Sequence, residues 1–267
     1  MDINFSDFVA ITSTQNEHVK NVVKLQRDSA TRRERNLTVV EGRRELRIAL
    51  ASGAKVAQIF WCAELTDLPH PVAEADECFR VSKAVYQKIA YRDTTEGLLA
   101  TIQPPARTLE QFQPEHDNPL VIVVERVEKP GNLGAILRTA DAAGVDAVMV
   151  CDEACDLYNP NVIRASIGSV FSVPAFTLSS EACIAWLKRH EVQILTAQLQ
   201  DSLPYYDVDM TRATAIVMGT EATGLTQAWR DAADAHILIP MAGMMDSLNV
   251  SVSTAILTFE AVRQRRG

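Results

Sequence analysis

The second half of the chain alternates between short apolar runs and helical segments, and this alternation constrains the fold more than any other feature. The runs are apolar at successive positions, which is typical of strands buried on both faces in a parallel sheet covered by helices. We expect strands at 120–125, 146–151, 192–198, 214–219 and 235–240, helices at 132–143, 180–190, from Gln227 onward and at 249–265, and partly helical structure at 159–171. The pattern predicts a doubly wound α/β domain.

The first half predicts a second, smaller α/β domain. Between the two halves, residues 103–119 contain four prolines and little periodicity, which indicates a linker. We therefore predict a domain over 1–103, a linker over 104–119 and a domain over 120–267. A chain of 267 residues is long enough to form two domains. Expected elements of the first domain are helices at 15–29 and 41–52 and strands at 37–42, 57–62, 78–82 and 97–102.

Composition excludes several classes of protein. There is no run of about 18 apolar residues, so we expect no transmembrane helix, and the acidic N-terminus without a basic region does not predict a secretory signal. The five cysteines form no CxxC pair, so we expect reduced thiols and a cytoplasmic location. The five histidines are scattered, which predicts no metal site.

Charge is unevenly distributed along the chain. The net charge of −8 argues against indiscriminate binding to nucleic acid. Between Lys20 and Arg47, however, there are nine basic and four acidic residues, a local charge of +5. This basic segment is either a set of solvated helix faces or a local footprint for RNA.

Small polar and charged side chains follow three of the predicted strands. Ligands of open parallel sheets bind beyond the carboxyl ends of the strands, so these side chains are candidates for a functional site. Each one alone has a simpler interpretation, since a glycine loop after a strand is usually a turn and Ser247 could cap a helix. The candidates are Asn132 and Arg138 after the first strand, Gly219, Glu221 and Gly224 after 214–219, and Ser247 and Asn249 after 235–240.

A dinucleotide site is a less favoured alternative. Gly131 and Gly134 open a helix after a strand, and Asp152 ends the next strand, which imitates part of a Rossmann fingerprint. The first glycine of that fingerprint is missing, and Pro130 lacks the N–H group that a pyrophosphate would need.

Three motifs in order resemble those of the SpoU (TrmH-type) family of SPOUT RNA methyltransferases. They are ERVEKPGNLGAILRTADAAGV, IVMGTEATGL and LIPMAGMMDSLNVSVSTAIL, and the stretch ITSTQNEHVKNVVKLQ…RRERNLTVVEGRREL resembles the ribosomal-protein-like RNA-binding domain of the family. The resemblance implies methyl transfer from S-adenosylmethionine to a ribose 2′-oxygen, and a C-terminal domain with a deep trefoil knot. Such knots are exceptions to the rule against threaded chains.

The resemblance also implies roles for individual residues. Arg138 would orient a phosphate and the 2′-oxygen and stabilise developing charge, because arginine is a poor general base. The other residues implied in catalysis are Asn132, Glu221, Ser247 and Asn249, and those implied in cofactor binding are Thr196, Gly219, Ile239 and Leu248.

RNA is the expected partner, with ribosomal RNA favoured over tRNA. Candidate RNA-binding residues are Arg32, Arg33 and Arg35 in the basic segment, and Arg164, for which a surface salt bridge is the alternative. The helix at 249–265 has more apolar surface than a half-buried helix needs, and with the resemblance this predicts a homodimer through the C-terminal domain. A different class of function stays open at this point, namely a non-catalytic RNA-binding or ribosome assembly factor.

Overall fold

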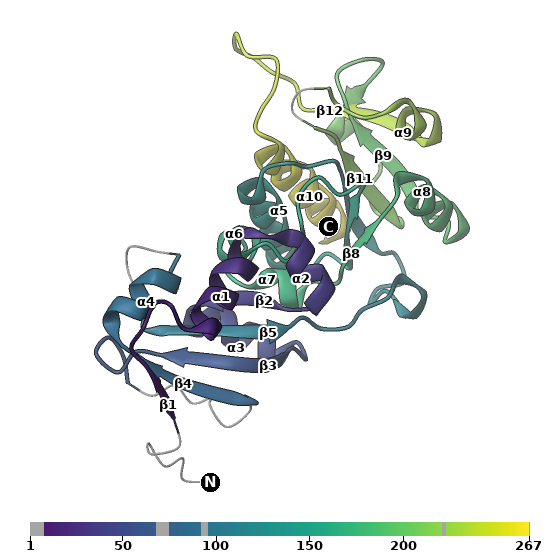
Figure 1. Cartoon of the computed structure of the whole chain (residues 1–267). Helices are drawn as coiled ribbons and strands as arrows, with labels where there is room; N and C mark the ends of the chain where they lie inside the picture. The colour runs from purple at the N-terminus through teal and green to yellow at the C-terminus, as the bar shows by residue number, and fades with distance from the viewer. Residues whose placement is uncertain (1–7, 68–74, 92–95, 221–222, 267) are drawn as a thin grey trace. The chain divides into compact units, whose positions relative to one another are not determined.

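The chain forms two compact units in a computed structural model that describes residues 8–67, 75–91, 96–220 and 223–266 (Figure 1). The first unit comprises Met1–Ala106 together with Tyr158–Ser172, and the second comprises Arg107–Leu157 with Val173–Gly267. No helix of the described residues is long and apolar enough to cross a membrane.

The second unit is built on a seven-stranded sheet in which every pair of neighbouring strands is parallel. This confirms the parallel sheet predicted from the apolar runs. The strand order is β10-β12-β9-β11-β6-β7-β8, so β6 and β11 lie side by side in the middle of the sheet. The strands are β6 (Leu120–Glu125), β7 (Ala147–Cys151), β8 (Ala175–Leu178), β9 (Gln193–Ala197), β10 (Leu203–Pro204), β11 (Thr214–Met218) and β12 (Ala235–Leu238).

Helices cover both faces of this sheet. One face packs against α8 and α9 around the fully buried Trp229, and the other packs against α5 and α10, which also contact each other (Figure 1). Alternate residues of β6 divide between the two faces, as strand geometry requires, with Val121 and Val123 on the α8 and α9 side. The helices are α5 (Pro130–Ala143), α8 (Ser180–Arg189), α9 (Gln227–Ala232), α10 (Val250–Arg266) and the 3₁₀ turns η3 (Leu109–Gln111) and η4 (Tyr205–Asp207).

Helix α5 begins two residues earlier than the sequence pattern suggested. Pro130 and Gly131 are not a turn before the helix, because Pro130 occupies its first turn. Proline is favoured there, since the missing N–H would have no partner within the helix and the fixed φ is already helical. The helix ends at Gly144, whose φ of 66° is left-handed.

The first unit contains a five-stranded mixed sheet in the order β1-β4-β3-β5-β2. Its predicted helices and strands are all present, while β1, α2 and α4 were not predicted. Helix α2 has no apolar stripe and is defined by its ends, since Asp28 accepts from the N–H groups of Ala30 and Thr31 and Asn36 is left-handed. The elements are β1 (Val9–Ile11), α1 (Glu17–Arg27), α2 (Ser29–Arg35), β2 (Thr38–Glu41), α3 (Arg43–Ala51), β3 (Lys55–Trp61), β4 (Glu77–Val81), α4 (Lys83–Ile89) and β5 (Leu98–Gln103).

The segment Tyr158–Ser172 joins the first unit, although the sequence boundary at 119 assigned it to the second. It carries α6 (Pro160–Ala165), which packs on β2, and α7 (Ser169–Ser172), which packs on α3. Thr38 Oγ1 donates to the carbonyl of Tyr158 at 2.7 Å. The first compact unit therefore ends at Ala106 and also includes the later segment Tyr158–Ser172. The composition of that segment does not reveal where it packs.

Candidate functional site

A cleft lies at the carboxyl ends of β6 and β11, where the sequence predicted a site. It has a volume of about 160 Å³, and one wall comes from the segment after β6, another from the segment after β11 and a third from the start of α10. Neighbouring parallel strands bring their carboxyl ends to one edge of the sheet, which explains why distant segments meet. The lining residues are Arg126, Val127, Glu128, Lys129, Asn132, Gly219, Thr220 and Val250.

Two predicted site residues from opposite ends of the second unit contact each other at this cleft. Asn249 Nδ2 donates to Asn132 Oδ1 at 3.2 Å. The Oδ1 atom of Asn249 accepts from the N–H of Ser251 at 3.0 Å and from its hydroxyl at 2.7 Å, so Asn249 caps α10. The sequence had considered Ser247 as the cap, and the structure assigns that task to Asn249. One asparagine thus both starts a helix and orients a second amide.

The loop after β11 is held in a narrow turn that requires glycine. Thr220 and Gly224 exchange backbone hydrogen bonds of 3.3 and 3.1 Å. A Cβ on Gly219 would lie 2.4 Å from the carbonyl carbon of Gly224, and Gly224 itself has a left-handed φ of 67°. A side chain at Gly219 is therefore excluded by contact, whereas one at Gly224 is only disfavoured by the backbone conformation, and the backbone of Gly219 remains accessible to the cleft.

A buried carboxylate anchors the far end of the same loop. Glu125, the last residue of β6, accepts hydrogen bonds from the N–H of Thr226 at 2.9 Å and from its hydroxyl at 2.7 Å. Thr226 precedes α9, so this contact ties the loop to the sheet. Nearby, Trp229 Nε1 donates to Ser180 Oγ at 2.9 Å, and Ser180 donates to Asp152 at 2.6 Å. The site edge is thus supported by a connected set of buried hydrogen bonds.

Arg138 lies apart from the contact between the asparagines. Its side chain is exposed, since α5 turns Leu133, Ile136 and Leu137 toward the core. Six residues of helix separate Arg138 from Asn132 by about 9 Å along the axis and about 120° around it. The described residues offer its guanidinium no hydrogen bond or ion pair, and Glu221 lies outside the described residues.

The remaining predicted site residues are dispersed around the edge of the sheet. Ser247 and Leu248 are exposed, and Ile239 is half-buried just after β12. Thr196 is fully buried, and its hydroxyl lies 2.6 Å from His236 Nδ1, so its side chain is engaged inside the unit. Among the described residues, no three metal-binding side chains come together.

Sequence reasoning missed several residues that line the cleft. Arg126 has a left-handed φ of 53°, an uncommon conformation for a residue other than glycine, and it turns the chain at the end of β6. Glu128, Lys129 and Thr220 line the cleft beside it. Their position in the sequence could have identified them, because all four residues lie in the segments that follow the central strands β6 and β11.

The basic segment of the first unit divides into structural and exposed residues. Arg32 is only 4% exposed, and its Nη1 donates to the carbonyl of Leu25 at 2.6 Å near the end of α1. The prediction that Arg32 contacts RNA conflicts with this burial, because its charge satisfies carbonyl groups inside the unit. Arg33 and Arg35 are exposed, and they make long hydrogen bonds to Ser29 and Asn21 respectively.

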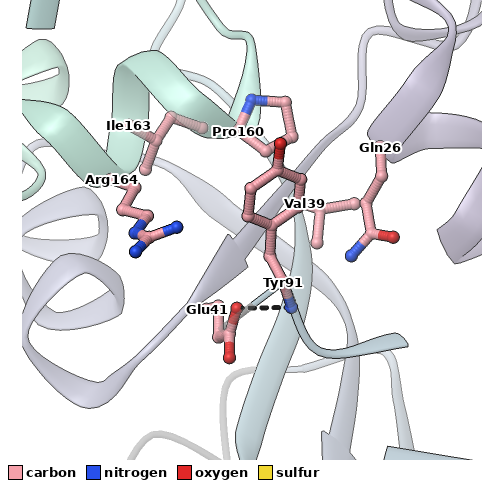
Figure 2. A pocket seen from close by; sticks show the side chains of 7 residues that line it. All are labelled: Gln26, Val39, Glu41, Tyr91, Pro160, Ile163 and Arg164. Carbon is pink, nitrogen blue, oxygen red and sulfur yellow. Dashed lines mark hydrogen bonds between the residues drawn. The ribbon is translucent and has the colours of Figure 1, made fainter. Parts of the chain in front are cut away.

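Arg164 lies in the first unit beside Tyr91, and it forms no salt bridge with another described residue (Figure 2). Its guanidinium carbon is 5.9 Å from the centre of the Tyr91 ring, and Asn161 Nδ2 donates to the Tyr91 hydroxyl at 2.8 Å. The N–H of Tyr91 donates to Glu41 Oε2 at 2.9 Å. The arginine, the aromatic ring and the Glu41 carboxylate thus line one small pocket of about 20 Å³.

The chain belongs to the SpoU rRNA methylase family, whose model matches residues 119–259. A second model, for the MRM3-like substrate binding domain, matches residues 16–100. The two matches correspond to the greater part of the second and first units, and they confirm the resemblance drawn from the three motifs.

Several characterised proteins are similar to the chain over nearly its whole length. The 23S rRNA (guanosine(2553)-2′-O)-methyltransferase of Bacillus subtilis is 30% identical over 252 residues, which cover 93% of this chain and 97% of the relative. A crystal structure of an RNA 2′-O ribose methyltransferase is 39% identical, with a TM-score of 0.84 and coverage of 97% and 100%. The AdoMet-bound rRNA methyltransferase of Sinorhizobium meliloti is 29% identical, with a TM-score of 0.87 and coverage of 96% and 98%.

Proposed function

We propose that this protein transfers a methyl group from S-adenosylmethionine to a ribose 2′-oxygen of ribosomal RNA. The observation that carries the proposal is the cleft after β6 and β11, where Asn132 and Asn249 meet beside Gly219 in a chain of the SpoU family. Relatives named for the reaction are 2′-O-methyltransferases of RNA, and two similar methyltransferases have been crystallised with AdoMet.

The lining of the cleft suits this cofactor. Val127 and Val250 provide apolar surface, while the backbone of Gly219 and the side chains of Thr220 and Asn132 provide hydrogen-bonding groups. S-adenosylmethionine is part apolar and part polar, and it supplies a methyl group already activated on a sulfonium. By family resemblance we expect Thr196, Gly219, Ile239 and Leu248 to hold it.

The task left to the side chains is to orient a weak nucleophile and stabilise the charge that develops on it. We expect Asn132 and Asn249 to bind the hydroxyl or shape the loops around it, because each amide fixes the other. Arg138 provides a permanent fork of donors for a phosphate and the 2′-oxygen. Its exposed position on α5 leaves the guanidinium available to RNA. Ser247 and Glu221 complete the proposed catalytic set.

We further propose that the protein is a homodimer formed by the second unit. Helix α10 buries Val250, Thr254, Leu257, Thr258 and Ala261, so the sheet and α5 do not cover its whole apolar surface. Val252 and Phe259 are each 47% exposed, and with the half-buried Ile256 they form a stripe at i, i+4 and i+7. We propose that this stripe packs against the same stripe of a second copy of the chain.

Two finer expectations follow from family membership and the proposed substrate. We expect the second unit to carry the deep trefoil knot of the SPOUT fold, in keeping with its all-parallel sheet. We expect a cytoplasmic location, because ribosomal RNA of bacteria is made and assembled there.

Titration with S-adenosylmethionine in a calorimeter separates the enzyme from a non-catalytic assembly factor. The proposal predicts saturable binding to the wild type. A matched variant, Gly219→Val, should lose binding while Ala51→Val, at an exposed position at the end of α3, keeps it. No detectable binding of the cofactor or of its demethylated product to the wild type would favour the assembly factor.

A further inference from the structure

A basic groove runs between α1 and α4 of the first unit. It has a volume of about 350 Å³ and is open to solvent. Four of its side chains are cationic, which contrasts with the net charge of −8 of the chain. The lining residues are Thr14, Gln15, Val19, Lys20, Val23, Lys24, Arg27, Asp28 and Lys88.

The cations of this groove are arranged in a stripe. Lys20, Lys24 and Arg27 occur at i, i+4 and i+7 of α1, so they share one face of the helix. Lys88 approaches from the last turn of α4, and all four are exposed. The stripe spans about 10 Å along α1, which is the axial length of about three phosphate spacings of one strand in a duplex.

Acidic residues near the stripe neutralise little of its charge. Asp28 is the acid of the groove lining, and its carboxylate accepts hydrogen bonds from the N–H groups of Ala30 and Thr31 as the cap of α2. Glu17 pairs with Lys20 at 3.2 Å, but both side chains are more than half exposed. Such solvated pairs contribute little to stability, and the lysine can exchange Glu17 for another anion.

We infer that this groove binds the sugar–phosphate backbone of the substrate RNA, an inference that rests on the proposed function. The cations would contact phosphates, while the apolar floor of Val19 and Val23 and the polar ends of Thr14 and Gln15 suit ribose. Phosphate contacts position an RNA without reading its sequence. The groove therefore supplies affinity and orientation, and it leaves the choice of nucleotide to other surfaces.

A pair of triple variants tests the groove. The groove variant combines Lys24→Ala, Arg27→Ala and Lys88→Ala, and the control combines Lys55→Ala, Arg80→Ala and Lys83→Ala, three exposed basic residues of the same unit outside the groove. Both lose the same charge. Affinity for an unmodified transcript of large-subunit ribosomal RNA is measured across salt concentrations, with thermal melting as the check of folding.

The groove variant should bind RNA more weakly, and the slope of log K against log salt should fall in magnitude by about 2, since each lost contact with a single strand removes about 0.7. Its KM for RNA should rise, while kcat at saturating RNA and the affinity for S-adenosylmethionine stay at wild-type values. An unchanged salt slope in the groove variant, or an equal loss of RNA affinity in the control, would overturn the inference that the groove binds RNA. If the wild type binds RNA but transfers no methyl group, the proposed function fails instead, and the groove is still judged by the binding slopes.

Discussion

At the scale of residues, the sequence identified candidate side chains by their chemistry, but it did not show where each side chain lies in the fold. The polar residues after three apolar strands predicted a site, and Asn132 and Asn249 meet there because parallel strands share a carboxyl edge. Arg32 was expected to contact RNA, but it is buried. Burial depends on which face of a helix meets the rest of the unit, and the run of charged residues around Arg32 does not reveal that.

Removing the guanidinium of Arg138 is expected to abolish most activity and leave the fold intact. An Arg138→Ala variant should lose about 10²–10³ in rate, since loss of one preorganised electrostatic group typically costs that much. Single-turnover methylation of the RNA measures it, and calorimetry should show unchanged affinity for S-adenosylmethionine. Arg138→Lys should fail as well, because a point charge does not replace the planar fork.

The matched control for Arg138 is Arg189→Ala, an exposed arginine at the end of α8. It should retain wild-type rates. The proposed role of Arg138 is wrong if its alanine variant keeps more than half of the wild-type activity, or if the control loses as much.

At the scale of elements, apolar periodicity predicted all the major strands and helices, and it failed where other forces define an element. Helix α2 lies between Asp28 and Asn36, which cap its two ends, and its residues form no apolar stripe. Strand β8, four residues long, was not predicted either. Helix α5 starts at Pro130 because proline is favoured in the first turn of a helix. The sequence analysis instead assigned Pro130 and Gly131 to a loop before the helix.

The outward stripe of α10 is expected to form the dimer interface. Phe259→Asp places a charge where a second copy would bury an aromatic ring, so it should split the dimer and lose activity together. Light scattering at micromolar concentration should report twice the 29.4 kDa mass for the wild type and the monomer mass for the variant.

A control for α10 is Val9→Asp, which alters an equally accessible apolar side chain of the first unit, 62% exposed. It should remain dimeric. An active wild-type monomer of about 29.4 kDa would contradict the proposed homodimer.

At the scale of the whole molecule, the sequence predicted two α/β parts and an approximate linker. It could not predict that Tyr158–Ser172 leaves the second unit to pack in the first. That packing depends on contacts between residues more than a hundred positions apart, such as Thr38 with Tyr158, and neither composition nor periodicity records such pairs. The knot likewise concerns the path of the chain in space, and only the family resemblance raised it.

The most direct test of the central claim is to map ribose methylation across total RNA from cells with and without the gene. The account predicts that at least one 2′-O-methylated nucleotide of the large-subunit ribosomal RNA disappears on deletion. It should return with the wild-type gene and stay absent with Arg138→Ala. Unchanged ribose methylation of ribosomal RNA in the deletion strain would contradict the account, and a loss confined to tRNA would show that the substrate was assigned wrongly.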